Sequence, residues 1–90
     1  MIFLIKFFTL LSCIDCKKYQ VVIQDYCNRT PTQLHIIDVD NYDNIRIVLD
    51  SKLTGIPYCI FYDMNGTILF TLEGVHSAEE FDTFLYENRC

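Results

Sequence analysis

The chain has 90 residues, which is enough for one hydrophobic core but not for two, so we expect a single domain over residues 1–90. A hydrophobic fraction of 51% excludes a disordered chain, and a formal net charge of −5 disfavours binding to nucleic acid or to an anionic membrane. No run of the sequence reaches the ~20 apolar residues of a membrane span, so we expect no membrane-embedded segment.

The first predicted element is a strand over residues 2–9 (IFLIKFFT), because a short apolar run rich in Ile and Phe suits a strand buried on both faces. The same stretch has a second interpretation, since an apolar run ending in LLSC resembles the signal of an exported lipoprotein. However, no positive segment precedes the run, and Lys6 lies inside it. We favour the strand, because cleavage before Cys13 would remove the middle of the predicted sheet.

A helix is predicted to follow from Cys13, where the apolar residues change to a helical period: Cys16, Tyr19, Val22 and Tyr26. Pro31 ends this helix by about residues 28–29. Residues 34–38 (LHIID) then form a short strand. Asn41 or Asp43 is a candidate cap for a second helix through about residue 52, with a predicted buried stripe of Ile45, Val48 and Leu49.

The last part of the chain predicts a hairpin and a third helix. Residues 58–63 (YCIFYD) and 67–72 (TILFTL) read as strands joined by the turn at Asn65-Gly66, and Gly74 ends the second strand. Ser77 and Glu80 form a capping-box pattern before a helix that carries Phe81, Phe84 and Leu85. The order β-α-β-α-β-β-α predicts an α/β fold with a four-stranded mixed sheet flanked by helices.

At this point the sequence resembles the thioredoxin family over most of its length. CIDCK (13–17) stands where thioredoxins have Cys-x-x-Cys-Lys, and GIP (55–57) matches their Gly-Ile-Pro, whose proline is cis. The stretch 56–85 follows the family's hairpin, glycine and final helix. The resemblance implies the thioredoxin fold and a thiol–disulfide oxidoreductase of glutaredoxin-like size. The chain starts at the active-site strand, without the extra strand and helix with which thioredoxins usually begin.

The Cys-Ile-Asp-Cys pair is the candidate catalytic site. Cys13 at a helix N-terminus meets unpaired backbone N–H groups and the positive end of the helix dipole, which favour its thiolate. Cys16 lies one turn on, on the same face, where it can attack a Cys13–substrate disulfide. We therefore assign Cys13 as the nucleophile and Cys16 as the resolving cysteine, and we expect no cofactor beyond this redox-active disulfide.

Several neighbours of the pair differ from the usual family residues and are candidates for tuning it: Ser12 stands in place of Trp, Ile14-Asp15 in place of Gly-Pro, and Phe7 in place of a buried carboxylate. The negative charge of Asp15 opposes a nearby thiolate, whereas Lys17 and Lys18 favour it, and we expect a reducing couple. By resemblance, cis-Pro57 packs against the dithiol and the Ile56 backbone pairs with a substrate strand, while Gly74 and Val75 complete the groove.

The alternative interpretation of the cysteine pair is that it forms half of a zinc or iron–sulfur site. Such a site needs two more ligands, and no second Cys-x-x-Cys or Cys/His pair occurs among the remaining candidates: Cys27, Cys59, Cys90, His35 and His76. We therefore expect no metal. Cys27 and Cys59 suit small core residues, Cys90 lies at the terminus, and the two histidines are expected at the surface or in turns.

Five cysteines, an odd number with only one close pair, favour a reducing compartment over a disulfide-stapled secreted scaffold, so we expect a cytoplasmic protein. The expected function is reduction of disulfides in client proteins through a mixed disulfide, with electrons from a thioredoxin-reductase-like protein or glutathione. We expect a monomer. Two alternatives stay open: a redox-inert binding module with the same fold, and a glutathione-dependent reductase of the glutaredoxin type.

Overall fold

The apolar run at the start of the chain forms a strand at the centre of the sheet in the computed structural model, which describes residues 2–88. Seven helices and strands and one 3₁₀ turn are present in these residues. In chain order they are β1 (Leu4–Thr9), α1 (Ile14–Arg29), β2 (Gln33–Asp38), η1 (Tyr42–Asn44), α2 (Ile45–Ser51), β3 (Tyr58–Tyr62), β4 (Ile68–Glu73) and α3 (Ala78–Glu87).

The sheet has the order β2-β1-β3-β4, in which β1 runs parallel to β2 and antiparallel to β3, and β4 is antiparallel to β3. Phe7 of β1 lies opposite Ile36 of β2 and Cys59 of β3. The predicted α/β architecture with a four-stranded mixed sheet is therefore confirmed. The segment that could be read as a lipoprotein signal is the strand that joins the two halves of this sheet.

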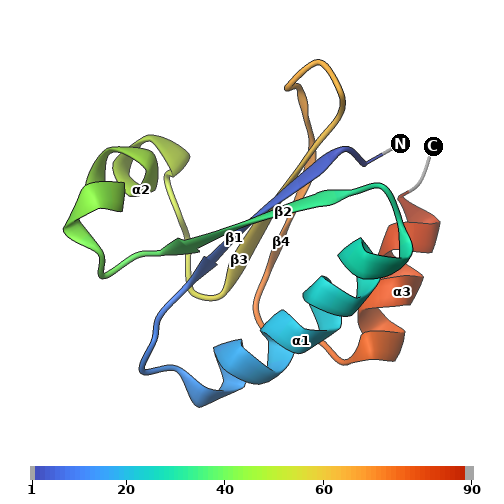
Figure 1. Ribbon diagram of the computed structural model, residues 1–90, viewed down its shortest axis with the longest axis horizontal. Helices are drawn as coiled ribbons and strands as arrows, with labels where there is room; N and C mark the ends of the chain where they lie inside the picture. Colours follow the sequence, from blue (N-terminus) through green and yellow to red (C-terminus); the bar gives the residue numbers. More distant parts are fainter. Residues whose placement is uncertain (1, 89–90) are drawn as a thin grey trace.

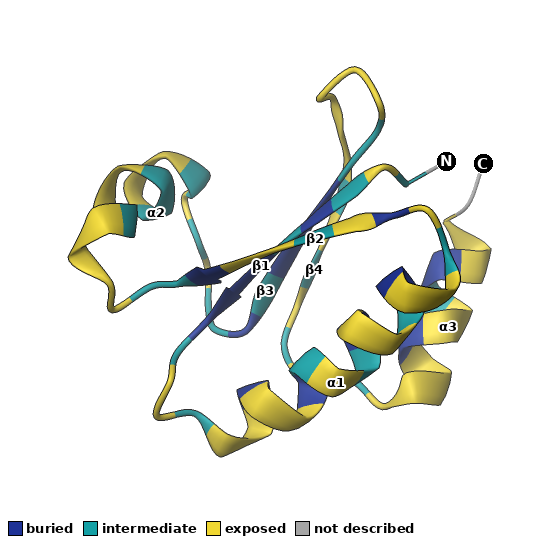
Figure 2. Ribbon diagram, viewed as in Figure 1, coloured by how far each residue is buried: buried dark blue, intermediate teal, exposed yellow. Residues whose placement is uncertain are grey.

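Each face of the sheet carries its own hydrophobic cluster, because alternate residues of β1 point to opposite faces. Ile5 and Phe7 belong to the larger cluster, which α1 and α3 cover, and Phe8 belongs to a smaller one on the other face, beside α2. Figure 1 shows α1 and α3 side by side, with α2 set apart from them across the sheet. In Figure 2 the buried residues concentrate on the strands and on the inner sides of α1 and α3.

Helix α1 forms because its buried residues keep a helical spacing while its charged residues face solvent. Its buried side chains are Cys16, Tyr19, Ile23 and Cys27, and it ends at Arg29, as the downstream proline predicted. Aromatic contacts join it to the rest of the core. The Tyr19 ring packs edge-on against the rings of Phe7 and of Phe81 in α3, with distances between ring centres of 5.8 Å and 5.9 Å.

The predicted buried stripe of the second helix is wrong at two of its three positions. Ile45 is 47% exposed and Leu49 is 69% exposed, whereas Ile47 and Val48 pack against the smaller cluster. Asn41 caps a 3₁₀ turn rather than the helix itself, since its side chain accepts a hydrogen bond from Asp43 N. A 3₁₀ turn has about 3.0 residues per turn, so it shifts the phase of the helix that follows.

The hairpin and the last helix follow their sequence signals. Gly66 is the last residue of the hairpin turn. It has φ +82, and its backbone N–H donates to the Asp63 carbonyl at 3.1 Å. Ser77 accepts from Glu80 N at 3.1 Å, and the Glu80 carboxylate accepts from Ser77 N at 2.9 Å, so the capping box is complete. Phe81 and Leu85 of α3 are buried, and Phe84 packs against the same core.

None of the helices within residues 2–88 is long and apolar enough to cross a membrane.

Lys6, the charged residue within β1, is half-buried, and its Nζ lies 4.9 Å from the centre of the Tyr62 ring. The aromatic face and the partial exposure together accommodate this charge in a central strand.

Candidate dithiol site

Cys13 is the N-cap residue of α1, and it is joined to Cys16 by a disulfide. The two Cα atoms are 5.2 Å apart, which is the spacing that one helical turn provides. The Cys13 backbone is extended, with φ −89 and ψ 105, and its Sγ accepts a hydrogen bond from Cys16 N at 3.1 Å. The sulfur of Cys13 therefore occupies the place that a capping oxygen takes in other helices.

The two sulfurs of the pair differ in access. Cys13 is half-buried, whereas Cys16 has 0% of its surface exposed. Cys16 begins the buried stripe of α1, and Cys13 stands just outside the helix in the turn after β1. A molecule in solution can therefore approach Cys13 but must displace protein atoms to reach Cys16.

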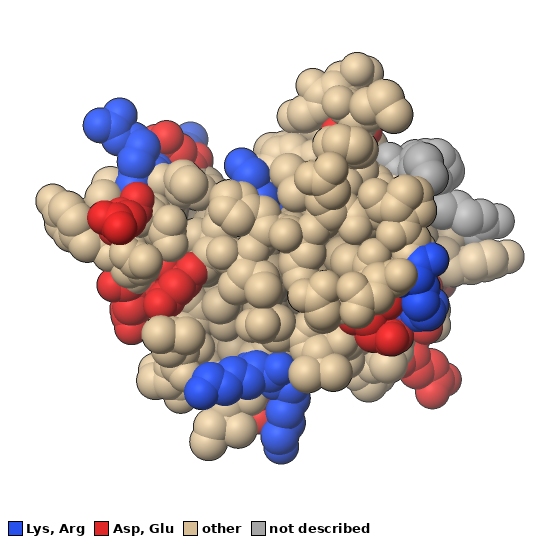
Figure 3. Space-filling model, in the orientation of Figure 1, with Lys and Arg blue, Asp and Glu red and all other residues tan. Residues whose placement is uncertain are grey.

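The residues proposed to tune the pair lie at the surface around it. Ser12, Asp15 and Lys17 are exposed, and so is Ile14 at 70%. Lys17 N donates to the Cys13 carbonyl at 3.2 Å, which continues the first turn of the helix. Figure 3 shows blue side chains over the first turns of α1, where the sequence carries Lys17 and Lys18. Because these side chains are exposed, solvent and salt screen their charges, and their tuning of the pair stays a prediction.

The other candidate residues emerge at the same end of the sheet as the cysteines. Phe8 of β1 pairs with Tyr58 of β3, and Tyr58 pairs with Glu73 of β4. The turn that follows β1, the segment that precedes β3 and the segment that follows β4 therefore leave the sheet at the same end of its strands. Figure 1 shows this end of the sheet beside the N-terminus of α1. The topology thus brings Cys13 to the same end of the molecule as residues 56–57 and 74–75.

The Ile56–Pro57 peptide bond is cis, and Pro57 is buried while Ile56 is half-buried. Gly74 N donates a hydrogen bond to the Pro57 carbonyl at 2.9 Å, so the segment after β4 is fastened to the proline. Gly74 has φ +90, a conformation that favours glycine, and Val75 beyond it is 48% exposed.

Glu73 makes a second link in this region, one that the sequence did not reveal. The Thr54 hydroxyl donates a hydrogen bond to the Glu73 carboxylate. A Cβ added to Gly55 would lie 3.2 Å from the Glu73 carboxyl carbon, so the carboxylate lies close against the loop before Pro57. The end of β4 therefore holds the Pro57 loop on both sides, through a backbone bond and through this side chain.

The core near the site holds thiol and phenol groups. Phe7, six residues before Cys13, is fully buried and lies opposite Cys59 in the sheet. Burial raises the pKa of the Cys59 thiol to about 12, and it also raises the pKa of the Tyr19 hydroxyl above its ordinary value. These groups are therefore neutral at pH 7 and do not accept a proton from Cys16 as a buried carboxylate would.

The remaining cysteines and histidines lie apart from any metal-binding arrangement in the described part of the chain. Cys27 and Cys59 are free thiols in the core, and Cys90 lies outside the described residues. His35 is exposed on β2, whereas His76 lies in the turn before α3, where its Nε2 donates to the Glu73 carbonyl at 2.9 Å. Within residues 2–88, no three His, Cys, Asp or Glu side chains are placed to hold a metal ion.

Comparison with solved structures identifies the thioredoxin fold. Thioredoxin O1 from Arabidopsis thaliana, in its oxidized state, superposes with a TM-score of 0.78 at 16% identity, covering 96% of this chain and 77% of that one. Thioredoxin 1 from Thermosipho africanus matches with a TM-score of 0.75 at 19% identity, over 97% of this chain and 99% of that one. A structure described as a malarial protein gives 0.80 at 15% identity, over 97% of both chains.

No protein-family model matches the sequence, and a search of curated proteins finds no matching relative. The similarity to these proteins is therefore one of backbone architecture, at identities too low to carry an activity from one protein to another. What the chain itself contributes is the disulfide-bonded pair at the start of α1.

Proposed function

We propose that this protein is a thioredoxin-family dithiol–disulfide oxidoreductase that reduces disulfides in client proteins. The observation that carries the proposal is the unequal access of two bonded sulfurs at a helix N-terminus, with Cys13 approachable and Cys16 buried. Reduction by two successive exchanges needs one thiol that meets the client and a second that is protected from it. The thioredoxin fold of the chain supports this assignment.

The reaction starts from the reduced dithiol. The Cys13 thiolate attacks one sulfur of the client disulfide, forming a Cys13–client bond and releasing the other client sulfur as a thiolate, which takes up a proton. Cys16 then loses its proton to water and attacks the Cys13 sulfur, which forms the Cys13–Cys16 disulfide and releases the second client thiol. Two electrons pass to the client, and the protein is left in the oxidised state seen in the structure.

Backbone amides at the helix N-terminus contribute to the first step. The Cys16 N–H already points at the Cys13 sulfur, and it would donate to a thiolate at the same position. The buried Pro57 and the half-buried Ile56 backbone at the same end of the sheet form a candidate edge for a client strand, with Gly74 and Val75 beside it. No resident cofactor or metal is needed for this chemistry.

The proposed electron donor is a thioredoxin-reductase-like protein or glutathione, and the proposed location is the cytoplasm, where the reducing glutathione pool would keep the pair cycling. We propose that the protein acts as a monomer, since both sulfurs of the reaction come from one chain.

The proposal is tested by the rate at which the protein accelerates reduction of insulin disulfides by dithiothreitol. We expect Cys13→Ser and Cys16→Ser each to return the rate to that of dithiothreitol alone, while Cys27→Ala, at a free core thiol, keeps the acceleration. An unchanged rate in either serine variant would contradict the assignment of the Cys13–Cys16 pair as the reacting dithiol, and no acceleration by the unaltered protein would favour the redox-inert binding module. Acceleration with glutathione as sole reductant, and none with a thioredoxin-reductase system, would favour the glutaredoxin-type alternative.

A further inference from the structure

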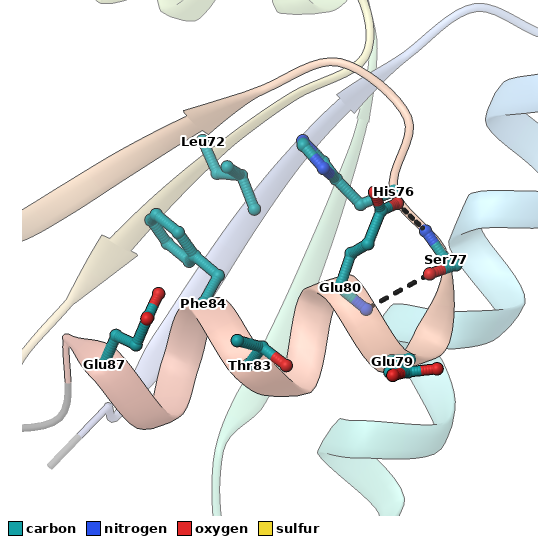
Figure 4. Close-up of a pocket in the computed structure, with 8 residues that line it drawn as sticks. All are labelled: Leu72, His76, Ser77, Glu79, Glu80, Thr83, Phe84 and Glu87. Atoms are coloured by element: carbon teal, nitrogen blue, oxygen red, sulfur yellow. Dashed lines mark hydrogen bonds between the residues drawn. The ribbon is translucent and has the colours of Figure 1, made fainter.

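A groove with a cavity volume of about 710 Å³ runs between the end of β4 and the outer face of α3. Figure 4 shows Leu72 of β4 and Phe84 of α3 on facing sides of it. The groove shares no lining residue with the dithiol site. It is lined by Leu72, His76, Ser77, Glu79, Glu80, Thr83, Phe84 and Glu87.

The lining combines an apolar floor with acidic side chains. Leu72 and Phe84 supply the floor, and the acidic groups are Glu79, Glu80 and Glu87. The Glu80 carboxylate is engaged by Ser77 N in the capping box. No Lys or Arg lines the groove, and among residues 2–88 no ion pair engages Glu79 or Glu87, because the pairs present are those of Arg29 with Asp25 and Asp82. The groove thus offers two carboxylates to a cationic ligand.

The groove also lies beside an open strand edge. β4 is the last strand in the order β2-β1-β3-β4, so its outer edge has no strand partner within the described residues. Ile68 and Leu69 on this strand are 55% and 38% exposed. An open edge of this kind can accept an additional strand through backbone hydrogen bonds. Such a strand would project alternate side chains toward the face of the sheet that α3 covers.

We propose that this groove binds an extended, basic segment of a partner protein, which adds to the edge of β4. Lys or Arg at alternate positions of the segment would lay their aliphatic stems on Leu72 and Phe84 and place their charged groups at Glu79 and Glu87. The ten residues of α3 span about 15 Å, which is the length of a strand of about five residues. The site is independent of the proposed redox reaction, because it uses neither cysteine.

The test measures binding of a blocked peptide, Thr-Arg-Val-Arg-Val-Arg-Thr, by fluorescence anisotropy, and maps its site from backbone amide chemical shifts in isotope-labelled protein. We expect saturable binding, with the largest shift changes in β4 and along α3, and no binding of the peptide in which Glu replaces each Arg. Absence of saturable binding, or shift changes centred elsewhere, would overturn the proposal.

Two double variants with the same change in net charge separate this site from general attraction to an acidic protein. Glu79→Lys with Glu87→Lys is expected to weaken binding by about 10-fold or more, because it reverses both carboxylates of the groove. Asp43→Lys with Asp50→Lys, at exposed positions on η1 and α2, is expected to change it by less than about 2-fold. An equal loss in both double variants would contradict a specific groove, and the mapping on the unaltered protein stands even if a variant fails to fold.

Discussion

The four described cysteines occupy two different environments, and this difference separates their chemistry. Cys13 caps a helix and is partly open to solvent, bonded to the buried Cys16. Burial in the core raises the pKa of Cys27 to about 11 and that of Cys59 to about 12. The two core thiols are therefore protonated at pH 7 and poor nucleophiles, so among the four described cysteines the pair is the one placed for thiolate chemistry.

The raised pKa values of the core thiols predict that stability falls at alkaline pH. In the unfolded chain these thiols lose their protons from about pH 9, whereas the folded protein holds them until about pH 11 to 12. The unfolded state then binds fewer protons, so the free energy of unfolding is fully retained below about pH 9 and decreases as the pH rises through this window. Urea unfolding of the oxidised protein at a series of pH values measures the slope.

Cys27→Ala with Cys59→Ala is the matched variant for this prediction, and its free energy of unfolding should decrease less steeply between pH 9 and 11. Comparison of slopes removes the contributions of titrating groups that lie away from the two cysteines, since both proteins share them. A slope equal to that of the unaltered protein would show that the core thiols titrate normally.

The Tyr19 hydroxyl is a buried polar group without a hydrogen bond to any group in residues 2–88, although it lies near the Cys59 thiol. Its ring, by contrast, packs against Phe7 and Phe81. We expect Tyr19→Phe to keep these contacts and to leave the free energy of unfolding unchanged or raise it by up to about 1 kcal/mol. Chemical denaturation measures this, with Tyr19→Leu as the control that loses the ring contacts and is destabilised. A clear loss of stability in Tyr19→Phe would mean that the hydroxyl has a partner in solution.

At the scale of single residues, the sequence was sufficient to predict that Cys13 and Cys16 lie together, but not which side chains surround them. The spacing of Cys13 and Cys16 at a predicted helix start is local information. The approach of Tyr19 to Cys59, and the contact of Glu73 with the loop before Pro57, depend on how distant strands align. A single sequence does not contain that register in readable form.

At the scale of the elements, the boundaries that carry a chemical signal were predicted closely. The proline at residue 31, the turn glycine at residue 66 and the capping box at residue 77 each mark a real boundary. α2 is the exception, because apolar residues lie on more than one of its faces and a 3₁₀ turn precedes it. Periodicity alone therefore chose the wrong face for Ile45 and Leu49.

Gly74 offers a test of how the end of β4 holds the Pro57 loop. Its φ of +90 is unfavourable for alanine, yet an added Cβ would meet no atom closer than His76 Nε2 at 4.0 Å. Gly74→Ala therefore isolates backbone strain, and we expect it to lower the free energy of unfolding by about 1–2 kcal/mol and to slow insulin reduction. Denaturant unfolding and the reduction assay measure the two effects.

Gly66→Ala is the matched control, because Gly66 has φ +82 in the hairpin turn and open space around it. We expect a similar loss of stability with no change in the reduction rate, since this turn connects the strand ends opposite to those at the dithiol site. Equal rates in both glycine variants would show that the Gly74–Pro57 hydrogen bond does not support catalysis.

At the scale of the whole molecule, the fold follows from the order of the elements together with the handedness of strand–helix–strand connections. That order also explains where the candidate site lies, because the turn after β1, the loop before β3 and the turn after β4 are at the same end of the strands. The sequence showed which residues adjoin each strand, and the topology brings those residues to one end of the sheet. The groove beside α3 could not be predicted, because it depends on how α3 lies against β4.

The most direct test of the central claim is capture of the mixed disulfide. Reduced Cys16→Ser is incubated with a disulfide-linked peptide dimer, and the intact protein is analysed by mass spectrometry with the adduct site mapped after digestion. We predict a stable adduct of one peptide on Cys13 in this variant, and none on Cys16 in the Cys13→Ser variant, because Cys16 is buried. No adduct on Cys13, or equal adducts on both variants, would contradict the assignment of Cys13 as the nucleophile.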